Sequence, residues 1–300
     1  TTMAVLPAAT GSNLNMAVFR SSDGLTFTPV TIVSFSDTPG FLGTPKGLGY
    51  DPRDGSVLVA ALQPVPPPNT ELAMVLAWST DGGASFTHPW TPWATPWPPQ
   101  EMRYVDGTPS ALVWRSASSF HFSADHGVTF TRIETLDPLP TGCAEILGFD
   151  MPRNNHDKVA IWCSGGGAHL CDLVTDQCSA LPLGGGTVAL RWATSNPLVL
   201  YAITSDRVWR SDDAGFAFAP IHAFSASQLR VDPASSTRVC ALQSPSGVLR
   251  CTRDNGATWM DLSPGVLQGG VPTVILDFDF ASNGRLWAVG HPGVVSNTEF

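Results

Sequence analysis

A short phrase recurs five times along this 300-residue chain, each time between stretches in which apolar and polar residues alternate. Its pattern is Ser/Thr-x-Asp-x-Gly-x-Thr-Phe/Trp, with small departures in single copies. The copies occupy residues 79–86, 123–130, 211–218, 252–259 and, one residue shorter, 21–27. In a tight turn, Asp accepts hydrogen bonds from backbone N–H groups one to three residues on, and Gly takes the positive-φ position. The phrase therefore predicts a β-hairpin turn that the final aromatic side chain covers.

Each copy carries the same chemistry, whereas a catalytic centre is needed only once, so the phrase is interpreted as structural. Ala217 replaces the usual Thr or Ser in one copy, which makes the hydroxyl dispensable there. His126, within another copy, is expected to face solvent. The structural aspartates predicted in this way are Asp23, Asp81, Asp125, Asp213 and Asp254.

The spacing of these aspartates indicates the architecture. Successive intervals are 58, 44, 88 and 41 residues, so the longest interval holds two units, one of which has lost the phrase. A second phrase, an apolar strand that ends in an acidic residue, opens units at residues 48–51, 147–150, 229–232 and 276–279. A repeat of about 40–50 residues with four strand signals is typical of a β-propeller. We expect an all-β fold of four-stranded antiparallel blades, with the repeated turns between third and fourth strands.

The blade count depends on the two ends of the chain. Incomplete units lie at 1–33 and 271–300, and we expect them to close one ring because closure removes exposed sheet edges. This gives a single domain over 1–300 with seven blades, or six if the terminal fragments form one sheet. Alternatively, a neighbouring chain or domain supplies a missing strand.

The six cysteines form three local pairs in this register. Pairing Gln243 with Val248 places Cys240 opposite Cys251 across a hairpin. Cys171 and Cys178 bracket the place of the missing phrase, where a disulfide would replace the Asp turn.

A third pair, Cys143 and Cys163, lies on successive strands, because pairing Phe149 with Asp157 or Lys158 brings the two cysteines approximately opposite. Three disulfides indicate an extracellular, periplasmic or cell-surface location. Free buried thiols and metal ligation are the alternatives. The chain has no Cys-x2-Cys and no His-x3-His pair, so zinc is disfavoured and no cofactor is expected.

Composition narrows the class of partner. The net charge is −9, only 14% of residues are charged and no three basic residues adjoin, which argues against nucleic acid and anionic membranes. No apolar run approaches the ~18 residues of a membrane span, so we expect no membrane insertion.

The repeated phrase, which is distributed over most of the chain, resembles the Asp-box or BNR repeat of sialidase-like and sortilin-like β-propellers. Sialidases share an Arg-Ile-Pro phrase and a Tyr/Glu nucleophile pair. The nearest phrase here, Arg132-Ile133-Glu134, follows a repeat instead of preceding the first one, and the only tyrosines, Tyr50, Tyr104 and Tyr201, are on or beside predicted core strands. Sialidase activity is therefore disfavoured.

Function in a propeller is expected around the central channel, at the innermost strands. Charged residues on or beside those strands form a mixed set that would bind a glycan, an anionic group or a peptide. The alternative is a solvated channel whose charges pair across blades. The residues are Lys46, Glu101, Arg103, Glu145, Arg191, Arg230 and Asp277.

A Trp/Pro-rich stretch at residues 88–99 is a second candidate surface. Its indoles, Trp90, Trp93 and Trp97, are stiffened by intervening prolines and would stack on a sugar or a proline-rich segment. Alternatively, they pack on the neighbouring blade.

Two functions follow. The preferred one is a secreted or cell-surface, non-enzymatic propeller that binds a glycan or protein partner. The alternative, similar to two-propeller xyloglucanases, is a glycoside hydrolase with two carboxylates about 5–9.5 Å apart. Its acids would be Glu101, Glu145 and Asp277, with Asp106 and Asp279 as further members of plausible pairs.

Overall fold

The computed structural model describes the second half of the chain almost completely and the first half mainly as separate strands. Before Ser79 only the backbone of the strands is described. The described residues are 16–20, 28–33, 42–50, 58–65, 75–81, 85, 101–105, 111–116, 118–126, 129–165, 167–183, 186–262, 274–280, 286–291 and 293–297. The chain divides into two compact units, Thr1–Thr135 and Leu136–Phe300, each considered by itself.

The first unit consists of antiparallel sheets whose strands pair in chain order. The strands are β1 (Met16–Arg20) with β2 (Thr28–Val33); β3 (Leu42–Tyr50), β4 (Leu58–Val65) and β5 (Val75–Ser79); and β6 (Glu101–Val105), β7 (Ala111–Arg115), β8 (Ser119–Ser123) and β9 (Arg132–Thr135). In the last of these sheets Trp114 is fully buried, stacks on His121 at 4.6 Å between ring centroids and meets Phe130 edge-on. Phe130 is the aromatic residue that closes one copy of the repeated phrase.

The second unit has the same meander pattern, with three four-stranded sheets and a described three-stranded one. The strands of its first two sheets are β10 (Ile146–Asp150), β11 (Lys158–Cys163), β12 (Ala168–Asp172) and β13 (Gln177–Ala180), then β14 (Ala189–Ala193), β15 (Asn196–Ile203), β16 (Val208–Ser211) and β17 (Ala219–His222). Those of its last two are β18 (Ala226–Val231), β19 (Val239–Gln243), β20 (Val248–Thr252) and β21 (Met260–Asp261), then β22 (Val274–Phe280), β23 (Leu286–His291) and β24 (Gly293–Asn297).

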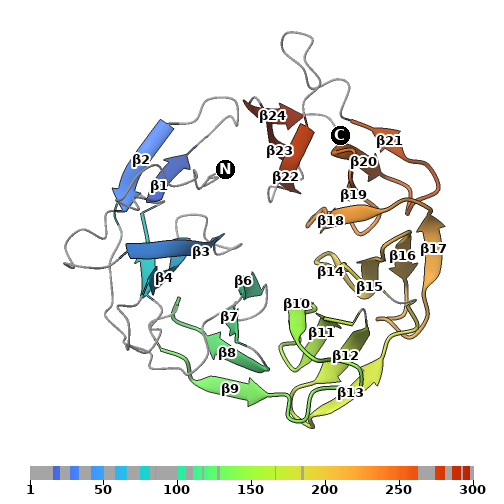
Figure 1. Cartoon of the computed structure of the whole chain (residues 1–300), viewed down its shortest axis with the longest axis horizontal. Helices are drawn as coiled ribbons and strands as arrows, with labels where there is room; N and C mark the ends of the chain where they lie inside the picture. Colours follow the sequence, from blue (N-terminus) through green and yellow to red (C-terminus); the bar gives the residue numbers. More distant parts are fainter. Residues whose placement is uncertain are drawn as a thin grey trace. The chain divides into compact units, whose positions relative to one another are not determined.

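Within this unit the first strands of successive sheets are neighbours: β14 contacts both β10 and β18, and β18 contacts β22 (Figure 1). The sheets pack face to face, and a continuous core runs through β11, β14, β15, β18 and β19. Leu190, Tyr201 and Leu229 in this core have no exposed surface. Strands β11, β15 and β19 bury successive residues, because neighbouring side chains point to opposite faces of a sheet and both faces are covered.

The repeated phrase forms turns that share a hydrogen-bond pattern. Asp254 Oδ1 accepts the Thr252 hydroxyl and the Thr258 N–H, each at 2.8 Å, and Oδ2 accepts the Thr258 hydroxyl at 2.6 Å. Equivalent bonds surround Asp81 and Asp125. The turns at Asp125, Asp213 and Asp254 lie between the third and fourth strands of their sheets. The carboxylate thus reaches the fourth residue on, whereas the sequence prediction stopped at the third.

Two further turn predictions have clear outcomes. Gly215 and Gly256 take the predicted positive φ, at 98° and 91°. His126 is partly buried, and its Nδ1 lies 3.0 Å from the Tyr104 hydroxyl of β6, so the expectation of a solvent-facing residue was wrong. Asp23 lies outside the described residues.

All three predicted disulfides are present: Cys143–Cys163, Cys171–Cys178 and Cys240–Cys251. The register that places Cys240 opposite Cys251 and Gln243 opposite Val248 is confirmed. The register proposed around Phe149 was wrong, because Phe149 pairs with Ile161 and Cys163 pairs with Ile146. Cys143 therefore reaches Cys163 from the segment before β10 and not from a paired strand.

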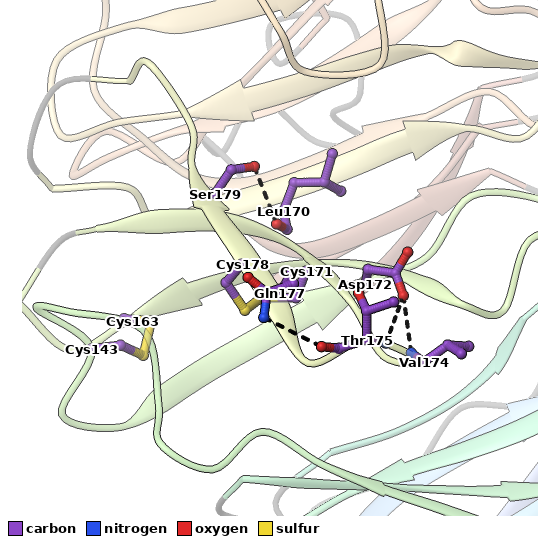
Figure 2. The surroundings of a disulfide bond; sticks show 10 residues. All are labelled: Cys143, Cys163, Leu170, Cys171, Asp172, Val174, Thr175, Gln177, Cys178 and Ser179. Carbon is purple, nitrogen blue, oxygen red and sulfur yellow. Dashed lines mark hydrogen bonds between the residues drawn. A yellow bond between two sulfur atoms is a disulfide. The ribbon is translucent and has the colours of Figure 1, made fainter.

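The turn between β12 and β13 also differs from its prediction. The disulfide was expected to replace an Asp turn, yet Asp172 Oδ1 accepts the N–H groups of Val174 and Thr175, each at 3.0 Å (Figure 2). Cys171 and Cys178 are direct cross-strand partners at the base of this turn. The disulfide is therefore found together with an Asp turn, in which the aspartate directly follows Cys171 and is not part of the repeated phrase.

Candidate functional site

The first strands of the second unit share an irregularity that organises their exposed side chains. In β10, β18 and β22 the pairing register skips one residue, namely Leu147, Ser227 and Leu276. Before β14, the N–H of Val188 bonds to Ile203 O while Ala189 pairs with the same Ile203, so Val188 is the corresponding extra residue. Such β-bulges redirect side chains and are frequent beside functional sites.

The bulges align the four strands with one another. Three residues after each bulge stands a charged side chain, and these four residues are called the first-strand row: Asp150, Arg191, Arg230 and Asp279. The sequence predicted Arg191 and Arg230 as binding residues, but it did not indicate that they hold equivalent positions on neighbouring strands.

Contacts between neighbouring sheets hold this row in place. Asp150 Oδ2 accepts the backbone N–H of Trp192 at 2.7 Å, which ties β10 to β14. Arg230 Nε lies 3.6 Å from Asp279 Oδ1, which ties β18 to β22. The row therefore has a carboxylate at each end and an arginine on each of the two middle strands.

Both arginines are positioned by aromatic rings. The Arg191 guanidinium carbon lies 5.4 Å from the centroid of Trp162, and that of Arg230 lies 5.8 Å from Phe278. Each guanidinium also donates to the backbone carbonyl of the preceding residue, at 2.7 Å for Arg191 and 3.0 Å for Arg230. Cation–π contact and this hydrogen bond reduce the freedom of the side chains, which favours binding because less entropy is lost.

Gly148 makes room for one of these rings. A Cβ at this position would lie 2.1 Å from the Trp162 indole, so only glycine lets the ring lie over β10 and reach Arg191. No sequence signal distinguishes this glycine from those in turns, because the requirement comes from a residue on the adjacent strand.

Apolar side chains adjoin the row. The bulge residues Leu147 and Val188 expose 52% and 37% of their surface, and Ser227 is also exposed. Asp279 exposes 61% of its side chain and Arg230 25%. The first-strand row and the exposed bulge residues Leu147, Val188 and Ser227 together are called the first-strand face. This face combines positioned guanidinium groups, an exposed carboxylate and aliphatic surface, which is a composition suited to binding.

The predicted catalytic acids are divided between the two units. Glu101, in β6 of the first unit, pairs with Arg103 at 2.6 Å and lies 4.0 Å from the nearly buried Arg115. Glu145, in the second unit, is exposed before β10, and its backbone carbonyl accepts the N–H of Ser164. Asp277 lies in β22, where its backbone alone is described.

The other predicted site residues are placed only in part. Lys46 is the bulge residue of β3, between partners Pro45 and Gly47, with its backbone alone described. Arg103 is engaged by Glu101. Trp90, Trp93, Trp97 and Asp106 lie outside the described residues.

Among the described residues, the carboxyl groups with a shifted pKa are in turns or at strand ends. Hydrogen bonding to Lys158 is the main cause that lowers the pKa of Asp172 to about 2, and hydrogen bonding to Thr258 does the same for Asp254. The pKa values of Asp125, Asp206 and Asp213 are also lowered, by hydrogen bonds that stabilise the ionised form. These groups act as structural acceptors, whereas a general acid requires a raised pKa.

Among the described residues, no three His, Cys, Asp or Glu side chains gather into a group able to hold a metal ion. The same part of the chain has no helix with the length and apolar character to cross a membrane.

Comparison with known proteins identifies the fold. No protein family matches the sequence, and a search of curated proteins also finds no match. Among solved structures, YCF48 bound to D1 peptide superposes with a TM-score of 0.62 at 15% identity, covering 96% of this chain and 88% of that one. YCF48 from Cyanidioschyzon merolae gives a TM-score of 0.65 at 14% identity and covers 94% and 90%.

The GH74 xyloglucanase from Xanthomonas campestris has a TM-score of 0.58 at 17% identity, over 96% of this chain but only 48% of the enzyme. The chain thus spans about half the length of that enzyme. Together with the meander sheets, these likenesses identify a β-propeller fold. At these identities they establish the fold alone.

Proposed function

We propose that this chain is a non-enzymatic propeller of an oxidising compartment that binds a protein or glycan partner on its first-strand face. The observation that carries the proposal is the first-strand row, in which Arg191 and Arg230 are held on aromatic rings, with Leu147 exposed on the first strand of a neighbouring sheet. A peptide is the preferred ligand, because arginine, carboxylate and aliphatic groups together match the mixed chemistry of a polypeptide. The solved complex of YCF48 with D1 peptide supports this choice by analogy of fold.

The finer features of the fold belong to the same proposal. The hydrogen-bond pattern around Asp81, Asp125, Asp213 and Asp254 supports the assignment of the repeats as Asp-boxes. Seven sheets among the described strands support seven blades in one domain over 1–300. The three disulfides support a secreted, periplasmic or cell-surface location. The Trp90, Trp93 and Trp97 stretch is a second proposed contact surface.

The test is binding of the purified chain to arrays of glycans and overlapping peptides, followed by mass spectrometry of the bound ligands. We expect binding without cleavage. In the double variant Arg191→Gln/Arg230→Gln, affinity should fall about tenfold or more, because two charge-assisted contacts are lost.

The matched control is Arg207→Gln. Arg207 also lies over an aromatic ring, Trp209, and pairs with an aspartate, Asp206, but it is outside the row. Equal affinity of the double variant, the control and the wild type would refute the proposed face.

Glycoside hydrolysis is the second candidate, favoured by the likeness to GH74 enzymes. It would use two of Glu101, Glu145 and Asp277. Cleavage of an array glycan, abolished in Glu101→Gln, Glu145→Gln or Asp277→Asn, would establish this function in place of the first. A binding protein would instead tolerate the loss of any one of these carboxylates.

A further inference from the structure

The turn between β16 and β17 exposes more apolar surface than a hairpin turn requires. Phe216 exposes 81% of its surface, and Leu198 at the start of β15 exposes 55%. The N–H of Ala214 donates to Leu198 O at 2.7 Å, so the turn lies against this end of β15. Phe216 and Leu198 therefore belong to the same end of the sheet.

The corresponding turn of the next sheet has no such surface. There the N–H of Asn255 donates to Thr237 O at 3.3 Å, the same contact in the same place. Ala257 thus corresponds to Phe216, and Thr237 corresponds to Leu198. Of these two sheets, only the one with Phe216 carries the apolar pair, and the turn at Asp254 forms without it.

The carboxylate of the same turn is also different. In the turns at Asp81, Asp125 and Asp254, a hydroxyl four residues on donates to Oδ2 at 2.6 Å. Ala217 takes that position after Asp213, so no turn hydroxyl reaches Oδ2. Asp213 Oδ1 still accepts the Ser211 hydroxyl at 2.7 Å and the Ala217 N–H at 2.9 Å, which keeps the carboxylate in the position seen in the other turns.

The two differences coincide in adjacent residues. The Asp213 carboxylate lacks the hydroxyl partner of the other turns, although the Phe216 N–H also stabilises its ionised form, and it stands in the same short turn as an exposed aromatic ring. Asp212 beside it exposes 69% of its side chain while it pairs with Arg210. Carboxylates bind ammonium and guanidinium groups most strongly, and exposed aromatic side chains are typical anchors of protein interfaces.

We propose that the Phe216 turn, meaning Asp213–Ala217 with Leu198, is a docking site for a basic segment of a partner chain. An Arg or Lys of the partner pairs with Asp213 Oδ2, and a neighbouring aliphatic side chain covers Phe216 and Leu198. The positive charge of the partner segment is inferred from these acidic groups and from the net charge of −9 of this chain. This site does not depend on the first-strand face.

The probe is a short Gly/Ser peptide that carries paired Arg and Leu residues, titrated against the full chain by fluorescence anisotropy. Its two matched peptides have Glu in place of Arg, or Ser in place of Leu. We expect binding of the Arg/Leu peptide alone. Phe216→Ala and Ala217→Thr should each weaken it about fivefold or more, because the first removes the apolar contact and the second returns a hydroxyl to Oδ2.

Thr258→Ala in the corresponding turn of the next sheet is the matched control. It removes the hydroxyl partner of Asp254 Oδ2, but Ala257 stands where the other turn has Phe216, so the affinity should be unchanged. Folding is not at risk, because Ala257 and Thr258 show that the turn accepts both substituted residues. The variant Arg191→Gln/Arg230→Gln should bind the probe normally, so failure of this site and failure of the first-strand face are distinguishable.

Three outcomes would overturn the proposal. The wild type could bind neither the Arg/Leu peptide nor its relatives, or Phe216→Ala and Ala217→Thr could bind as tightly as wild type. The third is concentration-dependent self-association in analytical ultracentrifugation that Phe216→Ala abolishes, which would assign the turn to a second copy of this chain.

Discussion

The turn after β20 and the turn after β12 occupy the same position in their sheets but are stabilised by different interactions. Each must reverse the chain between the third and fourth strands of a sheet. After β20, Asp254 binds a hydroxyl before the turn and an N–H and a hydroxyl after it. After β12, the disulfide Cys171–Cys178 joins the two strands, and Asp172 binds two N–H groups within the turn.

The difference lies in what holds the outgoing strand. In the repeated turns a hydroxyl–carboxylate pair and an aromatic side chain attach it to the sheet, as Thr129 and Phe130 do after Asp125. β13 has no aromatic residue, and its attachment is covalent. Asp172 is then free to turn outward and pair with Lys158 at 2.5 Å. The turn after β20 thus depends on several weak contacts, whereas the turn after β12 depends on a disulfide, two hydrogen bonds to Asp172 and one ion pair.

The largest effect should come from the aromatic anchor. Phe130→Ala removes a side chain that is 9% exposed and packs edge-on against Trp114, at a cost of about 3–4 kcal/mol in the free energy of unfolding. Urea denaturation measures it. Ser179→Ala in exposed β13 is the control and should cost less than about 0.5 kcal/mol. Similar losses for both variants would mean that the repeated turns do not rely on the aromatic side chain.

Removal of the covalent attachment should come next. The Cys171→Ala/Cys178→Ala variant opens a loop with a sequence separation of 7, so we expect a loss of about 2–3 kcal/mol from the larger entropy of the unfolded chain. Urea denaturation is again suitable. A loss no greater than that of Ser179→Ala would show that Asp172 and Lys158 suffice to hold this turn.

The carboxylate of a repeated turn should contribute slightly less. Asp125→Ala removes the acceptor of the Ser123 and Thr129 hydroxyls and the Thr129 N–H, and we expect a cost of about 2 kcal/mol. Thermal unfolding monitored by circular dichroism measures it. If Asp125→Ala melts at the wild-type temperature, the shared hydrogen-bond pattern has no energetic role.

A single hydroxyl of that turn should matter less again. Thr129→Ala copies the natural Ala217 and leaves Asp125 Oδ2 without its partner, at a cost of about 1 kcal/mol. The same thermal measurement applies. A cost equal to that of Asp125→Ala would place the whole effect of the carboxylate in this one contact.

The ionised state of Asp172 offers the finest distinction. Its pKa falls from 3.8 to about 2 in the folded protein. The ionised carboxylate therefore contributes fully to the free energy of unfolding above pH 3.8, and this contribution is lost as pH falls through 2. Asp172→Asn should therefore reduce stability at neutral pH and flatten the decline of stability between these values. Urea midpoints measured across that range check this, and an unchanged slope would contradict it.

Burial of neutral histidine should add a second acid-sensitive step at higher pH. The pKa values of His121 and His169 are lowered from 6.5 because burial disfavours the charged ring. The unfolded chain therefore binds protons more readily, and stability declines as pH falls below 6.5. His121→Phe, which retains a ring beside Trp114, should weaken this decline relative to the wild type.

Local features were predictable because their partners are close in sequence. The carboxylate of Asp254 and the hydroxyl of Thr258 are four residues apart, and Cys240 meets Cys251 across one hairpin. The repeat period also predicted four-stranded antiparallel sheets, which are observed for β6–β9, β10–β13, β14–β17 and β18–β21. The turn at Asp172 was not predicted because the repeated phrase does not surround this residue. An Asp whose carboxylate can accept the N–H groups two and three residues later is nevertheless itself a turn signal.

Features that depend on a bulge, on a longer loop, or on strands that are not neighbours in the sheet were not predictable in this way. The wrong register at Phe149 came from the assumption of an uninterrupted hairpin, whereas a bulge at Leu147 and a longer loop shift the pairing. The contact between Tyr104 and His126 links residues 22 positions apart on a strand and a turn. Such contacts depend on how a whole sheet twists and packs.

The sequence by itself determined the kind of sheet, the positions of the repeated turns and the cysteine pairs, because these follow from interactions within one hairpin or its immediate neighbours. Only the tertiary structure decided that Asp150, Arg191, Arg230 and Asp279 occupy one row, that Gly148 must admit the Trp162 ring, and that Phe216 stands exposed beside Asp213. Those arrangements arise where bulges align separate strands and where neighbouring sheets cover some side chains and leave others in solvent.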